Sequence, residues 1–147
     1  MKAIYFDMDG TIADLYGVKN WLDCLNNELT KPYREAKALV DMRKLGKLLN
    51  LLQERGYKLG IVSWLSKNGT PTYNARVAAA KKAWLKHHLS AVQWDEIKLV
   101  PYGTPKHNAV DNPSGILFDD AKRIRASWTG EAHDVHNILE VLSALVN

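Results

Sequence analysis

The sequence contains a single cysteine, Cys24, among its 147 residues. A disulfide framework within the chain is therefore excluded, which fits a protein of a reducing, intracellular compartment. The apolar runs are far shorter than the roughly 20 residues that a helix needs to cross a bilayer, so we expect no transmembrane helix and no membrane partner. The opening stretch MKAIYFDMDGT reaches acidic residues at once and lacks the apolar core of a secretory signal. We therefore expect it to belong to the fold of a cytoplasmic protein.

Several common ligand motifs are also missing. Neither GxGxxG nor GxxxxGK[ST] occurs, which excludes the usual dinucleotide cradle and the P-loop. The five histidines, including His87 and His88, do not have the spacing of zinc ligands, and we interpret them as surface or helix residues. The function must therefore depend on another arrangement of residues.

The composition is that of one globular domain, with 46% hydrophobic and 24% charged residues. The net charge is +4, but the charges are unevenly distributed. Between Glu54 and Asp95 there is no acidic residue, whereas the basic residues there are Arg55, Lys58, Lys67, Arg76, Lys81, Lys82 and Lys86. Such a segment either attracts phosphates or nucleic acid, or forms a solvated helix face.

Short apolar runs alternate with longer amphipathic ones. The short runs predict buried strands at 3–6, 58–63, 97–100 and 115–118, with a further short strand near 130–132. Apolar residues at helical spacing predict helices over 18–29, 41–55, 73–85 and 135–146. Pro32 is expected to interrupt the helical pattern after the first helix. Gly56 is expected to form the C-terminal cap of the second helix. Alternating strands and helices predict an α/β fold, a Rossmann-like three-layer sandwich with a mainly parallel central sheet.

Polar side chains follow three of the predicted strands. Acidic pairs follow the first and the fourth, namely Asp7 with Asp9 and Asp119 with Asp120. Ser63 ends the second strand, and Lys106 lies in the loop before the fourth. Because ligands of parallel sheets bind at the carboxyl ends of the strands, we expect these residues to meet. Four neighbouring carboxylates repel one another, and a cation bound by oxygen ligands, best Mg²⁺, would relieve that repulsion.

These residue types suit phosphoryl transfer. With Mg²⁺ present, Asp7 can remain ionised and attack phosphorus to form an aspartyl-phosphate. Asp9 can protonate the leaving oxygen and later activate the hydrolytic water. Lys106 and the Ser63 hydroxyl would stabilise the transferring phosphoryl oxygens.

DMDGT after an apolar strand, then Ser63, Lys106 and FDD in that order, resembles the haloacid dehalogenase (HAD) superfamily. The resemblance implies a HAD-type phosphatase in which Asp7 is the nucleophile and a Mg²⁺ ligand. It implies that Asp9 is the general acid and base and binds Mg²⁺ through its backbone carbonyl. It further implies Mg²⁺ ligation by Asp119 and, directly or through water, by Asp120. The dehalogenase branch replaces the second aspartate, so Asp9 favours phosphate transfer.

The resemblance also implies a set of phosphate-binding residues besides Asp7. Gly10 permits the tight path of the first motif, and Thr11 supports its geometry. Ser63, helped by the backbone N–H of Trp64, binds the phosphoryl group, and Lys106 neutralises its charge.

Residues 12–40 are too few for the cap domain that covers the site in many family members. We expect a single domain over 1–147, with a loop, a hairpin and a minimal helical cap, or none, in this stretch. Substrate contacts are predicted for Tyr16, Trp64 and Lys67, although Trp64 either stacks on a base or packs against the core. Trp21 either lines the entrance of the site together with Tyr16 or is a core residue, and its place on an apolar helical stripe favours the core.

The leading hypothesis is a Mg²⁺-dependent phosphomonoesterase of a nucleotide or another small phosphorylated metabolite, similar to the 5′(3′)-deoxyribonucleotidases. One alternative is a phosphatase of nucleic-acid termini, like the phosphatase half of polynucleotide kinases, and another is a non-catalytic phosphate-binding protein of the same fold. An open site would admit bulky substrates unless an oligomer partner closes it. A response-regulator receiver does not fit, because Lys106 precedes the final acidic pair.

Overall fold

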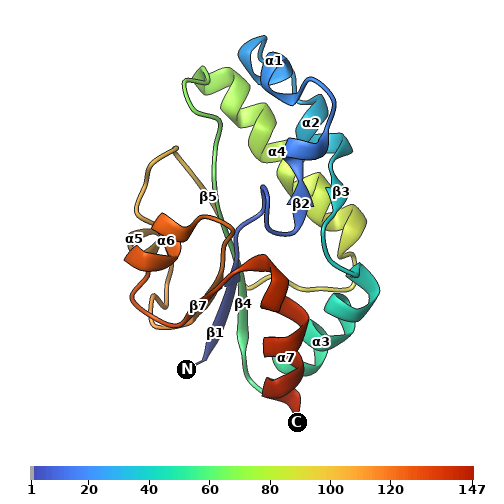
Figure 1. The fold of residues 1–147 in the computed structure, drawn as a ribbon, viewed down its shortest axis with the longest axis vertical. Helices are drawn as coiled ribbons and strands as arrows, with labels where there is room; N and C mark the ends of the chain where they lie inside the picture. Colours follow the sequence, from blue (N-terminus) through green and yellow to red (C-terminus); the bar gives the residue numbers. More distant parts are fainter. Residues whose placement is uncertain (1) are drawn as a thin grey trace.

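The computed structural model describes residues 2–147 and places a parallel sheet at the centre of the chain (Figure 1). Within these residues five strands form this sheet in the order β5-β4-β1-β6-β7. Every neighbouring pair in this order is parallel. The strands are β1 (Ala3–Phe6), β4 (Lys58–Trp64), β5 (Glu96–Val100), β6 (Ile116–Phe118) and β7 (Ala132–His133). The predicted α/β fold with a mainly parallel sheet is confirmed, including the short last strand.

Helices cover both faces of the sheet. Figure 1 shows α3 (Met42–Glu54) and α7 (Ile138–Val146) packed together on one side, and α5 (Lys106–Ala109) and α6 (Lys122–Ser127) on the other. Side chains alternate along β1, so that Ile4 and Phe6 join the larger core cluster while Tyr5 joins the smaller one. Because both faces are buried, the strand is apolar throughout, which explains the short apolar run in the sequence.

Two of the predicted helices begin and end where local signals place them. The carboxylate of Asp41 accepts hydrogen bonds from the backbone N–H groups of Arg43 and Lys44, both at 3.1 Å, and α3 begins at the next residue. Gly56 follows the helix with a φ of +95°, the left-handed conformation expected of a C-terminal cap. The long helix α4 (Pro71–His88) contains the predicted range 73–85.

The segment between the first strand and α3 forms a small hairpin with helices inserted in it. Strands β2 (Ala13–Asp14) and β3 (Lys37–Ala38) pair antiparallel, and between them lie the 3₁₀-helix η1 (Leu15–Gly17) and helices α1 (Trp21–Asn26) and α2 (Lys31–Glu35). Side chains from this segment, including Tyr33, pack against Tyr73 and Val77 of α4. The segment therefore lies over the same edge of the sheet as the start of α4 (Figure 1).

Two predictions for this segment are wrong. The helix expected over 18–29 covers only Trp21–Asn26 and contains no buried residue, because Asn20 and Glu28 adopt left-handed backbone angles on either side of it. Pro32 does not break a helix but lies in the first turn of α2. The N–H groups of a first turn have no partner within the helix, so proline is tolerated there. The last helix is confirmed as α7, preceded by the 3₁₀-helix η2 (Val135–Asn137). None of the helices within residues 2–147 combines the length and the apolar character needed to cross a bilayer.

Candidate active site

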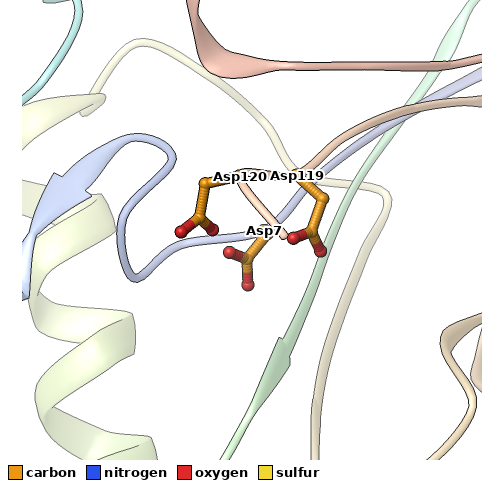
Figure 2. A group of neighbouring side chains, drawn as sticks. All are labelled: Asp7, Asp119 and Asp120. Atoms are coloured by element: carbon orange, nitrogen blue, oxygen red, sulfur yellow. The ribbon is translucent and has the colours of Figure 1, made fainter. Parts of the chain in front are cut away.

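The carboxyl edge of the sheet carries three aspartates at the ends of two adjacent strands. Asp7 follows β1 directly, and Asp119 and Asp120 follow β6. Backbone pairing continues past the strand ends, since the N–H of Asp7 donates to the carbonyl of Phe118 at 2.9 Å. Figure 2 shows the three carboxylates gathered together, and an oxygen of each lies within 4.8 Å of the others. The parallel register thus brings the first and last motifs of the sequence into contact.

The turn after β1 links the two motifs. The fully buried hydroxyl oxygen of Thr11 lies 3.0 Å from Asp7 Oδ2 and 3.2 Å from Asp120 Oδ1, and it accepts a hydrogen bond from the N–H of Asp120 at 3.1 Å. Gly10 has a φ of +81°, and a Cβ atom there would lie only 2.8 Å from Cγ of Asp120. Glycine at this position is therefore required both by the backbone angle and by the close approach of the Asp120 carboxylate.

Lys106, the first residue of α5, contacts two of the aspartates. Its Nζ donates to Asp7 Oδ1 at 2.9 Å and to Asp119 Oδ2 at 2.6 Å, and the residue is 3% exposed. Burial opposes the charge of the ammonium, but the attraction of Asp7 and Asp119 outweighs it and raises the pKa of Lys106 above its usual value. The lysine is therefore charged and holds the nucleophile candidate and a metal-ligand candidate together.

The acidic cluster carries more negative charge than Lys106 neutralises. Burial and the charge of Asp7 raise the pKa of Asp119 to about 6. The same two causes, in the same order, raise the pKa of Asp120 to about 7. Raised carboxylate pKa values mean that the folded protein disfavours the ionised forms, and a cation bound among these oxygens would favour them again. Three carboxylates at one edge are the hard oxygen donors that Mg²⁺ prefers, so the residues present fit this ion.

The side chain of Asp9 takes a different direction from these three. Its Oδ2 accepts a hydrogen bond at 2.9 Å from Nζ of Lys81, which also donates to the Ser63 hydroxyl at 2.8 Å and to the carbonyl of Trp64 at 2.7 Å. Burial and Asp7 raise the pKa of Asp9, and Lys81 opposes them. Ser63 itself is 1% exposed. The site therefore has two buried cations: Lys106 on the acidic cluster and Lys81 on Asp9 and Ser63.

The position of Lys81 was not predicted from the sequence, where it was counted within the basic segment. The structure buries it to 1% exposure, whereas its neighbour Lys82 is exposed. A signal was present in the sequence, because Lys81 lies four residues after Val77 and four before Leu85, both of which are buried. Position on the apolar face of the helix, rather than the charge of the segment, distinguishes this lysine from the solvated ones.

No protein-family model and no curated protein sequence matches the chain, but solved structures resemble it. A D,D-heptose 1,7-bisphosphate phosphatase from B. bronchiseptica, complexed with magnesium and phosphate, aligns with a TM-score of 0.63 at 14% identity over 99% of each chain. The D,D-heptose 1,7-bisphosphate phosphatase from Burkholderia thailandensis aligns with a TM-score of 0.50 at 17% identity, over 99% of this chain and 74% of that one. The chain has the HAD fold. Asp7 follows β1, Asp119 and Asp120 follow β6, Ser63 lies near the end of β4, and Lys106 begins α5.

In this HAD-fold chain the aspartates line a cavity of about 510 Å³. Lys106 and polar residues of the loop after β4 contribute to its lining, and several aromatic residues line it as well: Tyr16, Trp21, Tyr33, Trp64 and Tyr102. The cavity therefore combines charged groups with flat aromatic side chains.

The predicted substrate contacts all lie at this cavity. Tyr16 is 50% exposed, and Trp64 is fixed by a hydrogen bond from its indole N–H to the carbonyl of Thr104 at 2.7 Å. Lys67 lines the cavity too, with its Nζ 5.5 Å from the ring centroid of Tyr102.

Three aromatic residues of the cavity were not predicted as substrate contacts, namely Trp21, Tyr33 and Tyr102. Tyr102, which the sequence analysis did not single out, is 53% exposed and lies 4.8 Å from Trp64 between ring centroids. Trp21 matches both of its interpretations, because it packs against the core cluster that contains Tyr33 and Tyr73 and also lines the cavity. It is partly exposed and packs against Tyr16 at 4.9 Å between ring centroids, and no residue of the short helix α1 is fully buried.

Proposed function

We propose that this protein is a Mg²⁺-dependent phosphomonoesterase that acts through an aspartyl-phosphate on Asp7. The observation that carries the proposal is the pairing of Lys106 with Asp7 and Asp119 at distances of 2.9 and 2.6 Å, beside a third carboxylate. Phosphoryl transfer requires a positioned nucleophile and positive charge close to the phosphoryl oxygens, and the pairing of Asp7 with the buried Lys106 provides both. The shared fold with a phosphatase complexed with magnesium and phosphate supports it.

Mg²⁺ would be held by Asp7, Asp119 and Asp120, with Asp9 contributing its backbone carbonyl, and when bound it would share the negative charge of the phosphoryl group. The chain's own cations act on the same charge. Lys106 is close enough to Asp7 to neutralise the phosphoryl oxygens next to it.

The proposed reaction has two halves. In the first, an oxygen of Asp7 attacks phosphorus, the bond between phosphorus and the leaving oxygen breaks, and Asp9 donates a proton to that oxygen. In the second, Asp9 removes a proton from a water molecule, whose oxygen attacks phosphorus while the bond to Asp7 breaks. Inorganic phosphate leaves, and both aspartates return to their starting states. The raised pKa of Asp9 favours this exchange, because the group has to hold a proton part of the time.

Within this reaction class we propose a nucleotide as the substrate. The cavity volume of about 510 Å³ suits a small metabolite, and its aromatic lining offers flat surfaces for a base. Lys67 is placed at the same cavity, where it could meet a further anionic group of the substrate. The exposed basic residues of α4, such as Arg76 and Lys82, support a second candidate, a phosphatase of nucleic-acid ends.

The test measures phosphate release with Mg²⁺ from p-nitrophenyl phosphate, nucleoside monophosphates, sugar phosphates and 3′-phosphorylated oligonucleotides. Asp7→Asn should lower turnover at least about 1000-fold, since it removes the attacking carboxylate. Glu54→Gln, an exposed carboxylate at the end of α3, is the matched control and should behave as the wild type.

Persistent turnover in a clean Asp7→Asn preparation would exclude the covalent mechanism. Tight phosphate binding with no turnover of any compound would favour the non-catalytic alternative. Activity confined to the oligonucleotide and steeply lost with salt would favour the nucleic-acid substrate.

A further inference from the structure

Lys81 of α4 contacts two site residues, Asp9 and Ser63, neither of which is bound by Lys106. Its Nζ lies 2.9 Å from Asp9 Oδ2, 2.8 Å from Ser63 Oγ and 2.7 Å from the carbonyl oxygen of Trp64. An ammonium group has three N–H donors, and these three acceptors use all of them. Because the side chain is also 1% exposed, its position is determined by the site and not by solvent.

Packing of α4 alone does not account for a lysine at this position. A buried ammonium loses its hydration, which an apolar side chain of similar volume would not, and the neighbouring positions on this face, Val77 and Leu85, are apolar. The Nζ of Lys81 also lies 5.3 Å from the ring centroid of Tyr33, so a cation–π interaction adds to its three hydrogen bonds. The contacts of the charged group are therefore directed at oxygens of the proposed reaction centre.

The hydrogen bond to Ser63 determines which way that hydroxyl can point. Because Oγ accepts a hydrogen bond from the Lys81 ammonium, the hydroxyl's own hydrogen has to be directed at another acceptor. Ser63 is the penultimate residue of β4, and Asp7 directly follows the neighbouring parallel strand β1, so both lie at the carboxyl edge of the sheet. A phosphoryl oxygen bound at Asp7 would be the acceptor that this oriented hydroxyl meets.

The bond to Asp9 has a corresponding effect on the carboxylate. Lys81 holds Oδ2, which leaves Oδ1 as the oxygen that exchanges a proton with the leaving group or the water. It also keeps the side chain apart from the cluster of Asp7, Asp119 and Asp120, so that Asp9 does not become a fourth side-chain ligand of a cation there. One lysine thereby separates the acid–base residue from the metal-binding residues.

We propose that Lys81 is a positioning residue for phosphoryl transfer, whose ammonium orients both the Asp9 carboxylate and the Ser63 hydroxyl. The proposal rests on the phosphatase function proposed above. A loss of Asp9 orientation affects a reaction more when the leaving group needs protonation, whereas general damage to the site affects all substrates alike. This difference separates a positioning role from a merely structural one.

The experiment compares Lys81→Met with Lys82→Met, a change of the adjacent, exposed lysine on the same helix. The substrates are p-nitrophenyl phosphate and phenyl phosphate, which have nearly the same shape but differ in how much their leaving oxygen needs a proton. With Mg²⁺, kcat/KM of Lys81→Met should fall about 10-fold for p-nitrophenyl phosphate and about 100-fold or more for phenyl phosphate. Lys82→Met should keep the wild-type values for both.

Retention of kcat/KM within threefold in folded Lys81→Met, or an equal fall for both substrates, would overturn the positioning role. If Lys81→Met does not unfold cooperatively, Lys81→Gln, which has N–H donors but no charge, is measured by the same criterion. A wild-type protein that hydrolyses neither compound would overturn the proposed function and the role of Lys81 with it. A wild-type protein that hydrolyses both, with a variant that does so equally well, would overturn the role of Lys81 alone.

Discussion

Protons and Mg²⁺ are expected to compete for the same carboxylate oxygens of this protein. The pKa of Asp119 is raised to about 6 and that of Asp120 to about 7, by burial first and by Asp7 second. Both groups are therefore largely protonated at pH 5 and largely ionised at pH 8. Mg²⁺ binds the ionised oxygens, so lowering the pH across this window should weaken its binding.

The magnitude follows from the two pKa values. At pH 5 about one molecule in ten has an ionised Asp119, and about one in a hundred has an ionised Asp120. If both groups must be ionised to bind Mg²⁺, the product of these two fractions raises the Mg²⁺ dissociation constant about 1000-fold between pH 8 and pH 5. Asp120 is exposed, and solvent screening of its charge reduces the expected change to about 100-fold.

The same shifts affect stability, and the sign is opposite to that of an aspartate whose pKa is lowered in the folded state. A carboxyl whose pKa is raised in the folded state stabilises that state at low pH and loses this contribution as the pH rises through the folded value. For the buried Asp119, a rise from 3.8 to about 6 corresponds to about 3 kcal/mol. Metal-free protein should therefore lose stability from pH 4 to pH 8, and Mg²⁺ should raise its melting temperature more at pH 8 than at pH 5.

Calorimetric titration of metal-free protein with MgCl₂ at pH 5, 6, 7 and 8 measures the effect directly. Asp120→Asn removes one of the two competing protonations, so its dissociation constant should change only about 10-fold over the same range. A wild-type dissociation constant that stays within threefold between pH 5 and pH 8, in protein that remains folded, would refute the assignment of Mg²⁺ to these carboxylates.

Two further substitutions test the turn and the cavity. Gly10→Ala adds a Cβ atom 2.8 Å from Cγ of Asp120 at a left-handed backbone position, so it should cost about 1–3 kcal/mol of unfolding free energy and weaken Mg²⁺ binding. Denaturant unfolding and metal titration measure these effects, and a variant with wild-type values in both would contradict the proposed geometry. Tyr102→Ala removes an exposed aromatic side chain of the cavity and should raise KM for a nucleotide about 10-fold while leaving KM for p-nitrophenyl phosphate within threefold. An equal change for both compounds would count against stacking of a base at this residue.

Most of the sheet and its carboxyl-edge residues could be predicted from the sequence, because their signals are local. The strand before Asp7 is apolar throughout, and it is buried on both faces. Asp41 and Gly56 bound α3 through their own backbone and side-chain preferences. Parallel pairing then leaves little freedom: once β1 lies beside β6, Asp7 and Asp119 have to meet.

The segment between β1 and α3 was harder to predict, for an equally physical reason. Trp21 and Leu25 have helical spacing and pack against a small core cluster, but no residue of this short helix is fully buried, and both side chains also line the cavity. A pattern of apolar residues shows that a surface needs a partner, but it does not show whether the partner is the protein's core or a substrate.

The order of the motifs, the strands that precede them and the chemical types of the predicted site residues, Lys106 among them, can be read from the sequence alone. Which of the basic residues between Glu54 and Asp95 lies at the site depends instead on the packing of the helices against the sheet. Lys81 meets Asp9 across 72 residues of chain, a contact that exists because α4 packs against the edge of the sheet. The charge of a lysine is a property of the residue, but its burial and its partners depend on how distant elements pack.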